Sequence, residues 1–162
     1  MNSPKRFSVT AILLLATVIT SGCASTGSGA SEIEASIPES AFEIHLYSDQ
    51  GEEDYLGFIR RRLEMQGFEV AQFSTVDQNL ATIPTDIGRQ LSLAILVSVA
   101  NDPDVGKTRA VFSGIQGRGQ DPADLVGGAR WSQTDDNLAF AFSRLAQIAD
   151  RIDHDRLVYA VE

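Results

Sequence analysis

The segment LSLAILVSVANDPDVGKTRAVFSGI, residues 91–115, holds the most apolar run of residues 42–162 and a strong turn signal. Every second residue from Leu91 to Val99 is apolar, and Ala94 and Leu96 make the other face partly apolar as well. This alternation predicts a central β-strand. The Asn, Asp, Pro and Gly residues of 101–106 predict a turn. Residues 107–115 are therefore expected to pair back as the second strand of a hairpin.

A strand, a helix and a second strand are predicted ahead of this hairpin. FEIHLYS, residues 42–48, alternates apolar and polar side chains, which is typical of a half-buried strand. Asp49 lies three residues before Glu52, and this spacing predicts a capping box that opens a helix. The helix carries an apolar stripe of Tyr55, Leu56, Ile59 and Leu63, and Gly67 ends it.

The remaining elements complete a small α/β domain. FEVAQF, residues 68–73, predicts a strand, residues 74–89 are polar and irregular, and residues 116–133 predict a long loop. A helix is expected from Asp135 to Asp153, with Leu138, Ala141, Phe142, Leu145, Ile148, Ala149 and Ile152 on one face.

RLVYAV, residues 156–161, predicts a closing strand. The order of elements is then β-α-β-β-β-α-β. It predicts a single two-layer α/β sandwich, with a mostly antiparallel five-stranded sheet and both helix stripes on one face of the sheet.

The N-terminus has the organisation of a secretory signal peptide. Lys5 and Arg6 precede the uncharged apolar residues 7–19, and small residues follow. This apolar run is shorter than the roughly 20 residues that span a bilayer. A cleaved signal peptide is favoured over an uncleaved anchor.

Residues 19–23, ITSGC, resemble the lipobox of bacterial lipoproteins. The resemblance implies thioether lipidation of Cys23, cleavage after Gly22 and acylation of the new N-terminus. The alternative is a signal peptide with a chance cysteine. Ala24 stands where an aspartate would favour the inner membrane, so the resemblance implies a location at the periplasmic face of the outer membrane.

The domain organisation follows from this reading. Residues 1–22 are expected to be the signal peptide, and 23–41 the lipidated N-terminus and a flexible tether rich in Ser, Gly, Ala and Glu. Residues 42–162 are expected to form one periplasmic domain. The strand, helix and GFEV start of this domain resembles small periplasmic α/β modules, some of which bind cell-wall material or activate envelope synthases.

Composition excludes several classes of function. Cys23 is the only cysteine of the 162 residues, so the mature domain has no disulfide, thiol nucleophile or cysteine metal site of its own. Removing Lys5 and Arg6 with the signal peptide leaves 11 basic against 22 acidic residues. This negative charge disfavours nucleic acid as a partner.

Catalytic, metal and cofactor motifs are incomplete. VGKT, residues 105–108, lacks the first glycine of a phosphate-binding loop, and NDPDVG lacks the closing Glu of a calcium loop. His45 and His154 do not have metal-ligand spacing. No Gly-x-Ser-x-Gly sequence occurs. We expect no enzyme activity, no metal and no cofactor.

Two features remain as candidate binding sites. On the second helix, Phe140 points away from the apolar stripe, near Arg144 and Arg151, which is the composition of an interface hot spot. The alternative is a Phe covered by a neighbouring loop. In the 116–133 loop, Arg130 and Trp131 follow two glycines, and Trp with Arg can stack on a sugar or anchor a protein. The alternative is a Trp131 packed in the core.

The sequence thus predicts a lipid-anchored envelope protein whose domain binds a protein partner without catalysis. The competing hypothesis is a module that binds peptidoglycan or a small ligand through the 116–133 loop.

Overall fold

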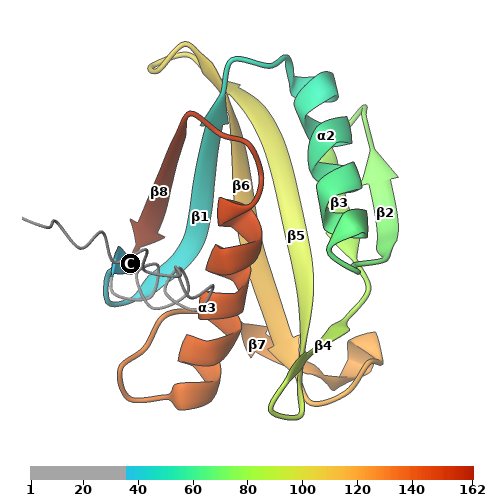
Figure 1. Ribbon diagram of the computed structural model, residues 1–162, viewed down its shortest axis with the longest axis vertical. Coiled ribbons are helices and arrows are strands. Elements are labelled where there is room, and N and C mark those ends of the chain that lie inside the picture. Colours follow the sequence, from blue (N-terminus) through green and yellow to red (C-terminus); the bar gives the residue numbers. More distant parts are fainter. Residues whose placement is uncertain (1–35) are drawn as a thin grey trace, which may run out of the picture.

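The computed structural model describes residues 36–162 as a mixed α/β domain with an open, mostly antiparallel sheet of eight strands and two helices (Figure 1). The elements in chain order are β1 (Ala41–Ser48), α2 (Glu52–Met65), β2 (Val70–Ser74), β3 (Asn79–Thr82), β4 (Thr85–Gly88), β5 (Leu91–Asp102), β6 (Lys107–Gly117), the 3-10 turn η1 (Pro122–Asp124), β7 (Leu125–Gly128), α3 (Asp136–Asp150) and β8 (Arg156–Val161).

The β5–β6 hairpin is the centre of the sheet, as the sequence predicts. Its register runs unbroken from the pair Ser92 and Gly117 to the pair Asp102 and Lys107. Gly106, in the connecting turn, has a positive φ of 70°, a conformation that costs glycine little. The two long strands provide pairing edges for all but the outermost strands, β2 and β8.

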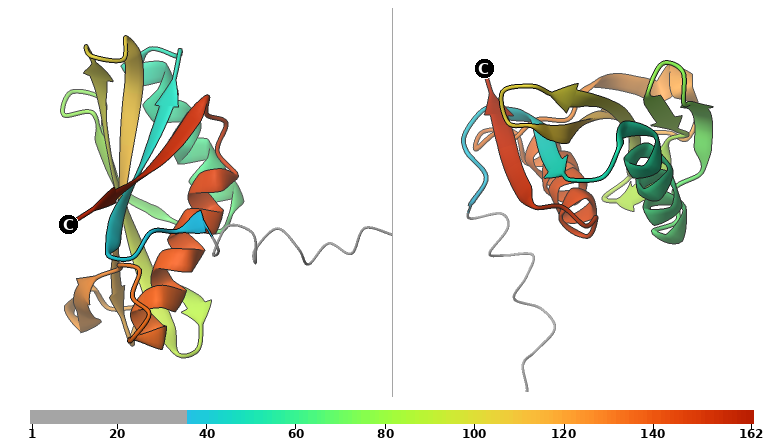
Figure 2. Two further views of the ribbon diagram at one scale, coloured as in Figure 1. Left: turned by 90° about the vertical axis from the view of Figure 1, so that its left-hand side faces the viewer. Right: turned by 90° about the horizontal axis from the view of Figure 1, so that it is seen from above.

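The strand order is β2-β3-β5-β6-β1-β8, with β4 also paired to β5 and β7 also paired to β6. Both helices lie on the same side of this sheet (Figure 2). Between the helices and the sheet lies the core, whose largest fully buried side chains include Tyr55, Phe112, Phe142, Ile44, Leu93, Ile95 and Leu145. Burial of these side chains is the main term that favours folding.

The opposite face of the sheet carries no α-helix among the described residues (Figure 2). From Ile95 onward β5 alternates accordingly, because Ile95, Val97 and Val99 are buried whereas Leu96 and Ser98 are exposed. Nearer the start of β5, Ser92 and Ala94 of the same face are buried, and Ser92 Oγ donates to the Gly119 carbonyl. Antiparallel sheets tolerate a solvated face when its side chains are small or polar.

The helix α2 buries the whole stripe that the sequence predicts, but its cap differs. Tyr55, Leu56, Ile59 and Leu63 of α2 are all buried. Gly51 is the N-cap of α2 and makes no side-chain cap, so the predicted capping box of Asp49 and Glu52 is wrong. The Glu52 carboxylate instead accepts a hydrogen bond from the Asn101 backbone N–H at 2.7 Å.

Of the stripe predicted for the second helix, Leu138 is only half-buried and Ile152 is buried just beyond the end of α3, whereas the other five residues are buried within it.

The five-stranded sheet was an underestimate. β3 and β4 lie in the stretch that looked irregular, and β7 lies in the predicted 116–133 loop. Each of these strands has four residues, too few to display a clear alternation. They form because the long strands β5 and β6 provide hydrogen-bonding edges for them. Which segments pair with these edges depends on the tertiary structure and not on the local sequence.

The packed part of the domain begins before residue 42, the predicted boundary. Ile37 and Ala41, which are 7% and 0% exposed, pack into the core ahead of residue 42. Among the described residues no helix is both long and apolar enough to cross a bilayer.

We expect Ile95→Ala to lower the free energy of unfolding by about 2–5 kcal/mol, because it leaves a cavity beneath the helices. Leu96→Ala, the matched control on the exposed face, should cost less than about 1 kcal/mol. Urea unfolding followed by Trp131 fluorescence measures both. Equal losses would show that the uncovered face is buried in solution.

Candidate functional site

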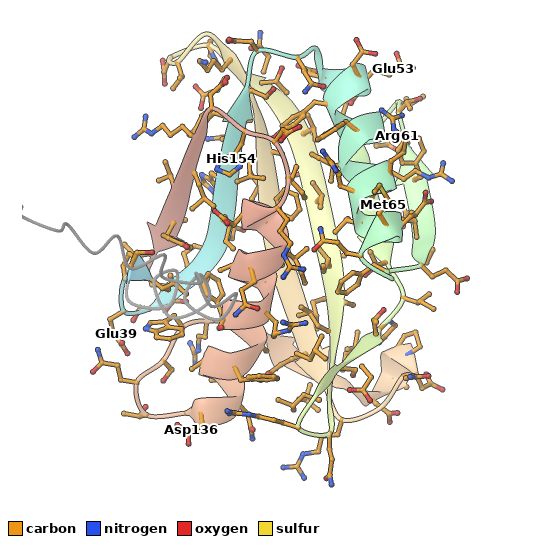
Figure 3. The ribbon with its side chains drawn as sticks, viewed as in Figure 1. Glu39, Glu53, Arg61, Met65, Asp136 and His154 are labelled. Carbon is orange, nitrogen blue, oxygen red and sulfur yellow. The ribbon has the colours of Figure 1, made fainter. Side chains whose placement is uncertain are left out.

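The structure brings Phe140 and Trp131, predicted separately from the sequence, into one groove. This groove, which we call the aromatic groove, is lined by Arg89, Trp131, Asp136, Ala139, Phe140 and Ser143 and has a volume of about 270 Å³. Both aromatic side chains are half-buried. Asp136 marks its position toward the lower end of the molecule, whereas Glu53 and His154 lie toward the upper end (Figure 3).

Backbone contacts hold the two aromatic residues in place. The Asp135 carboxylate caps α3 by accepting hydrogen bonds from the N–H groups of Asn137 at 3.0 Å and Leu138 at 3.1 Å. This cap fixes where α3 begins and hence where Phe140 points. The Trp131 N–H donates to the Ala41 carbonyl at 2.7 Å, which ties the segment before α3 to the start of β1.

Arg89 closes the aromatic groove from the β4–β5 hairpin. Its guanidinium lies 4.4 Å from the centre of the Phe140 ring, within cation–π range. Arg89 and Gln90 have φ values of 55° and 59°, a left-handed conformation that Gly or Asn usually occupies in two-residue hairpin turns. The turn therefore stores backbone strain while presenting a long basic side chain to the ring.

The sequence did not indicate Arg89. It lies at the end of the stretch that looked irregular, and neither its spacing nor its neighbours form a motif. Its role depends on the packing of the β4–β5 hairpin against α3, where the Phe140 ring also lies close to Gly88.

The two arginines predicted to flank Phe140 do not line the aromatic groove. Arg144 is half-buried, and its Nη1 donates to Gln147 Oε1 at 2.8 Å on the same helix. Arg151 is exposed at the C-terminal cap of α3. Cys23, the predicted lipidation site, lies outside the described residues.

Arg130 lines a second, larger cavity. It lies in the notch between β1 and β7, which both pair with β6 but at different positions along it. We call this cavity the β1–β7 notch. Its volume is about 500 Å³, and its lining includes Phe42, Glu43, Ser113, Ile115, Gly128 and Arg130. Although Arg130 and Trp131 are adjacent in sequence, they therefore line different cavities.

Glu43 connects a serine and a histidine on the uncovered face of the sheet. Ser113 Oγ donates to Glu43 Oε1 at 3.2 Å, and His45 Nε2 lies 3.3 Å from Glu43 Oε2. A hydrolytic triad requires the histidine between the serine and the carboxylate. Here the carboxylate stands in the middle, so His45 is not placed to remove the serine proton.

A charged cluster lies near the turn of the β5–β6 hairpin. Lys107 Nζ contacts Asp155 at 2.7 Å and Asp49 at 3.1 Å. The ammonium group lowers the pKa of Asp155, and the two carboxylates raise the pKa of Lys107.

Burial, with smaller contributions from Asp155 and Asp153, raises the pKa of Tyr55.

Residues 36–162 contain no cluster of three His, Cys, Asp or Glu side chains arranged to hold a metal ion. No family model matches the chain, and no curated protein is significantly similar to it. The aromatic groove and the β1–β7 notch are therefore the two candidate binding sites.

Arg89→Gly and Arg89→Ala both remove the contact with Phe140, but only glycine relieves the left-handed strain. We expect the Gly variant to be more stable than the Ala variant by about 1 kcal/mol. Thermal or urea unfolding of the two variants measures this difference. Equal stabilities would mean that the turn is unstrained in solution.

The Lys107 cluster predicts a pH dependence. Because the pKa of folded Asp155 is lowered, its contribution to stability is present above the unfolded pKa and is lost as pH falls through the folded value. Asp155→Asn should therefore destabilise the protein at neutral pH and make no difference in strong acid. The free energy of unfolding as a function of pH measures this. A constant difference would exclude the ion pair as the cause.

Proposed function

We propose that this protein is a lipid-anchored lipoprotein at the periplasmic face of the outer membrane, whose domain is a non-enzymatic interaction module of the cell envelope. The aromatic groove is its binding site for a protein partner. In this proposal the fold acts as a two-layer sandwich in which the helix layer shapes the groove. The lipobox resemblance of residues 19–23, with acylation of Cys23, supports the location.

The size and lining of the aromatic groove carry the proposal. At about 270 Å³ it is below the usual range of about 300–1,000 Å³ for small-molecule sites, and it suits a single inserted side chain. Trp, Phe and Arg around a shallow depression are the residue types enriched in interface hot spots. Arg89 lies over the Phe140 ring and Asp136 adds a carboxylate, so an inserted basic or aromatic side chain would find complementary contacts.

The strained turn at Arg89 and Gln90 supports the same conclusion. A turn serving only the fold would be more stable with Gly or Asn at these positions. Keeping arginine in a costly conformation is explained if its guanidinium is needed at the rim of the groove.

The β1–β7 notch favours a second candidate function. Its volume of about 500 Å³ would admit a small ligand or a piece of cell-wall sugar, and Arg130 and Glu43 place both signs of charge in its lining. In this alternative the 116–133 segment binds the ligand through Arg130, and Trp131 has a packing role.

A capture experiment in membranes tests the two candidates. Cells producing the full-length protein are mildly crosslinked, and co-purified proteins are identified for wild type, Phe140→Ala, Ala139→Trp and Met65→Ala. We expect one envelope protein to be enriched with wild type. Phe140→Ala should weaken its binding by about 30-fold, because loss of a hot-spot aromatic costs about 2 kcal/mol. Ala139→Trp should fill the groove and also block binding.

The control is Met65→Ala, which removes an exposed apolar side chain at the end of α2 and should leave capture unchanged. Cys23→Ala should abolish capture if the anchor is needed. Capture that survives both groove variants would exclude the aromatic groove. Binding of cell-wall fragments that Arg130→Ala removes would instead establish the second candidate.

A further inference from the structure

The outer edge of β8 has no partner strand within residues 36–162. Among the described strands, β8 pairs with β1 alone, in an unbroken register from Glu43 to Tyr47 on β1. In the left-hand view of Figure 2, β8 is the element nearest to the viewer. The N–H and C=O groups along this outer edge are therefore available to another strand.

β8 lacks the features that usually protect an edge strand. The five residues Leu157 to Val161 include no charge and no proline, and Val161 is 51% exposed. The β1–β8 ladder shifts register between Ala41 and Glu43, but the extra residue is on β1, so β8 itself is not bulged. The opposite edge, β2, differs: it carries the extra residue of its own register shift, between Val70 and Gln72, and Arg60 covers the Phe73 ring at 4.9 Å. Bulges and charges of this kind discourage pairing, whereas an uncharged regular edge favours it.

Arg156, which begins β8, and Glu162, which directly follows its last residue, identify the partner strand. RLVYAVE, residues 156–162, begins with Arg156 and ends with Glu162. When two copies pair antiparallel about Tyr159, Arg156 of each lies opposite Glu162 of the other. Parallel pairing of the same strands in register would place like charges side by side. The pattern is thus complementary to itself in one orientation only.

We propose that β8 pairs antiparallel with β8 of a second copy about a two-fold axis at Tyr159, joining the two sheets into one. In this register Val158 faces Ala160 of the other copy, and exposed Val161 faces its Leu157. The two cross-strand ion pairs offset part of the repulsion between two negatively charged domains. The interface buries backbone edges, and so leaves the aromatic groove open.

This arrangement suits two chains anchored in one membrane. Ala41 pairs with Val161, so each chain enters the domain beside the end of β8. The two Val161 residues would be offset by four residues, or roughly 13 Å along the strands. That separation is within the reach of the 12 residues 24–35 of each chain, roughly 19 Å when they act as the flexible tether that the composition predicts.

Charge exchange tests the register. Two differently tagged full-length chains are produced in the same cells, and detergent extracts are purified through one tag. Wild-type chains should co-purify. Arg156→Glu in both chains, or Glu162→Arg in both, should reduce co-purification by about tenfold or more, because like charges then meet at both ends. One chain with Arg156→Glu and the other with Glu162→Arg should recover it, because opposite charges meet again.

The matched controls are Arg61→Glu and Glu69→Arg, which make the same charge changes at exposed positions away from β8 and should have no effect. Thermal unfolding verifies that each variant folds. Failure of wild-type chains to co-purify would overturn the proposal and leave the β8 edge to an extended segment of another protein. Failure of the mixed pair to recover would overturn the proposed register.

Disulfide formation provides an independent measurement in membranes. Val158→Cys in one chain and Ala160→Cys in the other should crosslink, because directly opposed residues lie about 4.5–5.5 Å apart between Cα atoms. Two chains that both carry Val158→Cys should crosslink much less, because their cysteines are diagonal neighbours. Chains with Cys23 alone give the background. Equal crosslinking in both pairings would contradict the antiparallel register.

Discussion

The antiparallel pairing of β5 and β6 is the constraint on which the rest of this structure depends. These two strands, 12 and 11 residues long, pair directly with β1, β3, β4 and β7, and the outermost strands β2 and β8 join the sheet through β3 and β1. Their buried faces, with Ile95 and Phe112, form the floor on which both helices lie. Because the chain has no cysteine beyond Cys23, burial and backbone hydrogen bonding must hold the domain together.

The two ends of the β5–β6 hairpin differ in the residues that surround them. Near the turn, Lys107 of β6 forms a solvated charge cluster with Asp49 and Asp155. At the other end β4 and β7 join the hairpin, and the segment after β7 returns past Trp131 to α3. The aromatic groove and the β1–β7 notch both include residues from these short elements or the segments after them.

Local sequence patterns were sufficient to predict a helix or strand that is long enough to show the spacing of its apolar residues. The buried stripe of α2, with Tyr55 and Ile59, and the alternation of β5 were predictable because one face of each is covered. β3, β4 and β7 were not, since four-residue strands carry no clear period. The predicted cap at Asp49 was wrong because Gly51, two residues later, is the N-cap of α2, and the Asp49 carboxylate lies instead 3.1 Å from Lys107 Nζ.

The sequence by itself determined the class of fold, the two helix faces, the central hairpin, and Phe140 and Trp131 as unusual aromatic residues. Each depends on neighbours within a few positions along the chain. Only the tertiary structure decided that these two aromatics share a groove, that Arg89 covers one of them, and that Arg130 faces a separate notch. These relations join residues far apart in sequence, and no local period encodes which hairpin packs against which helix.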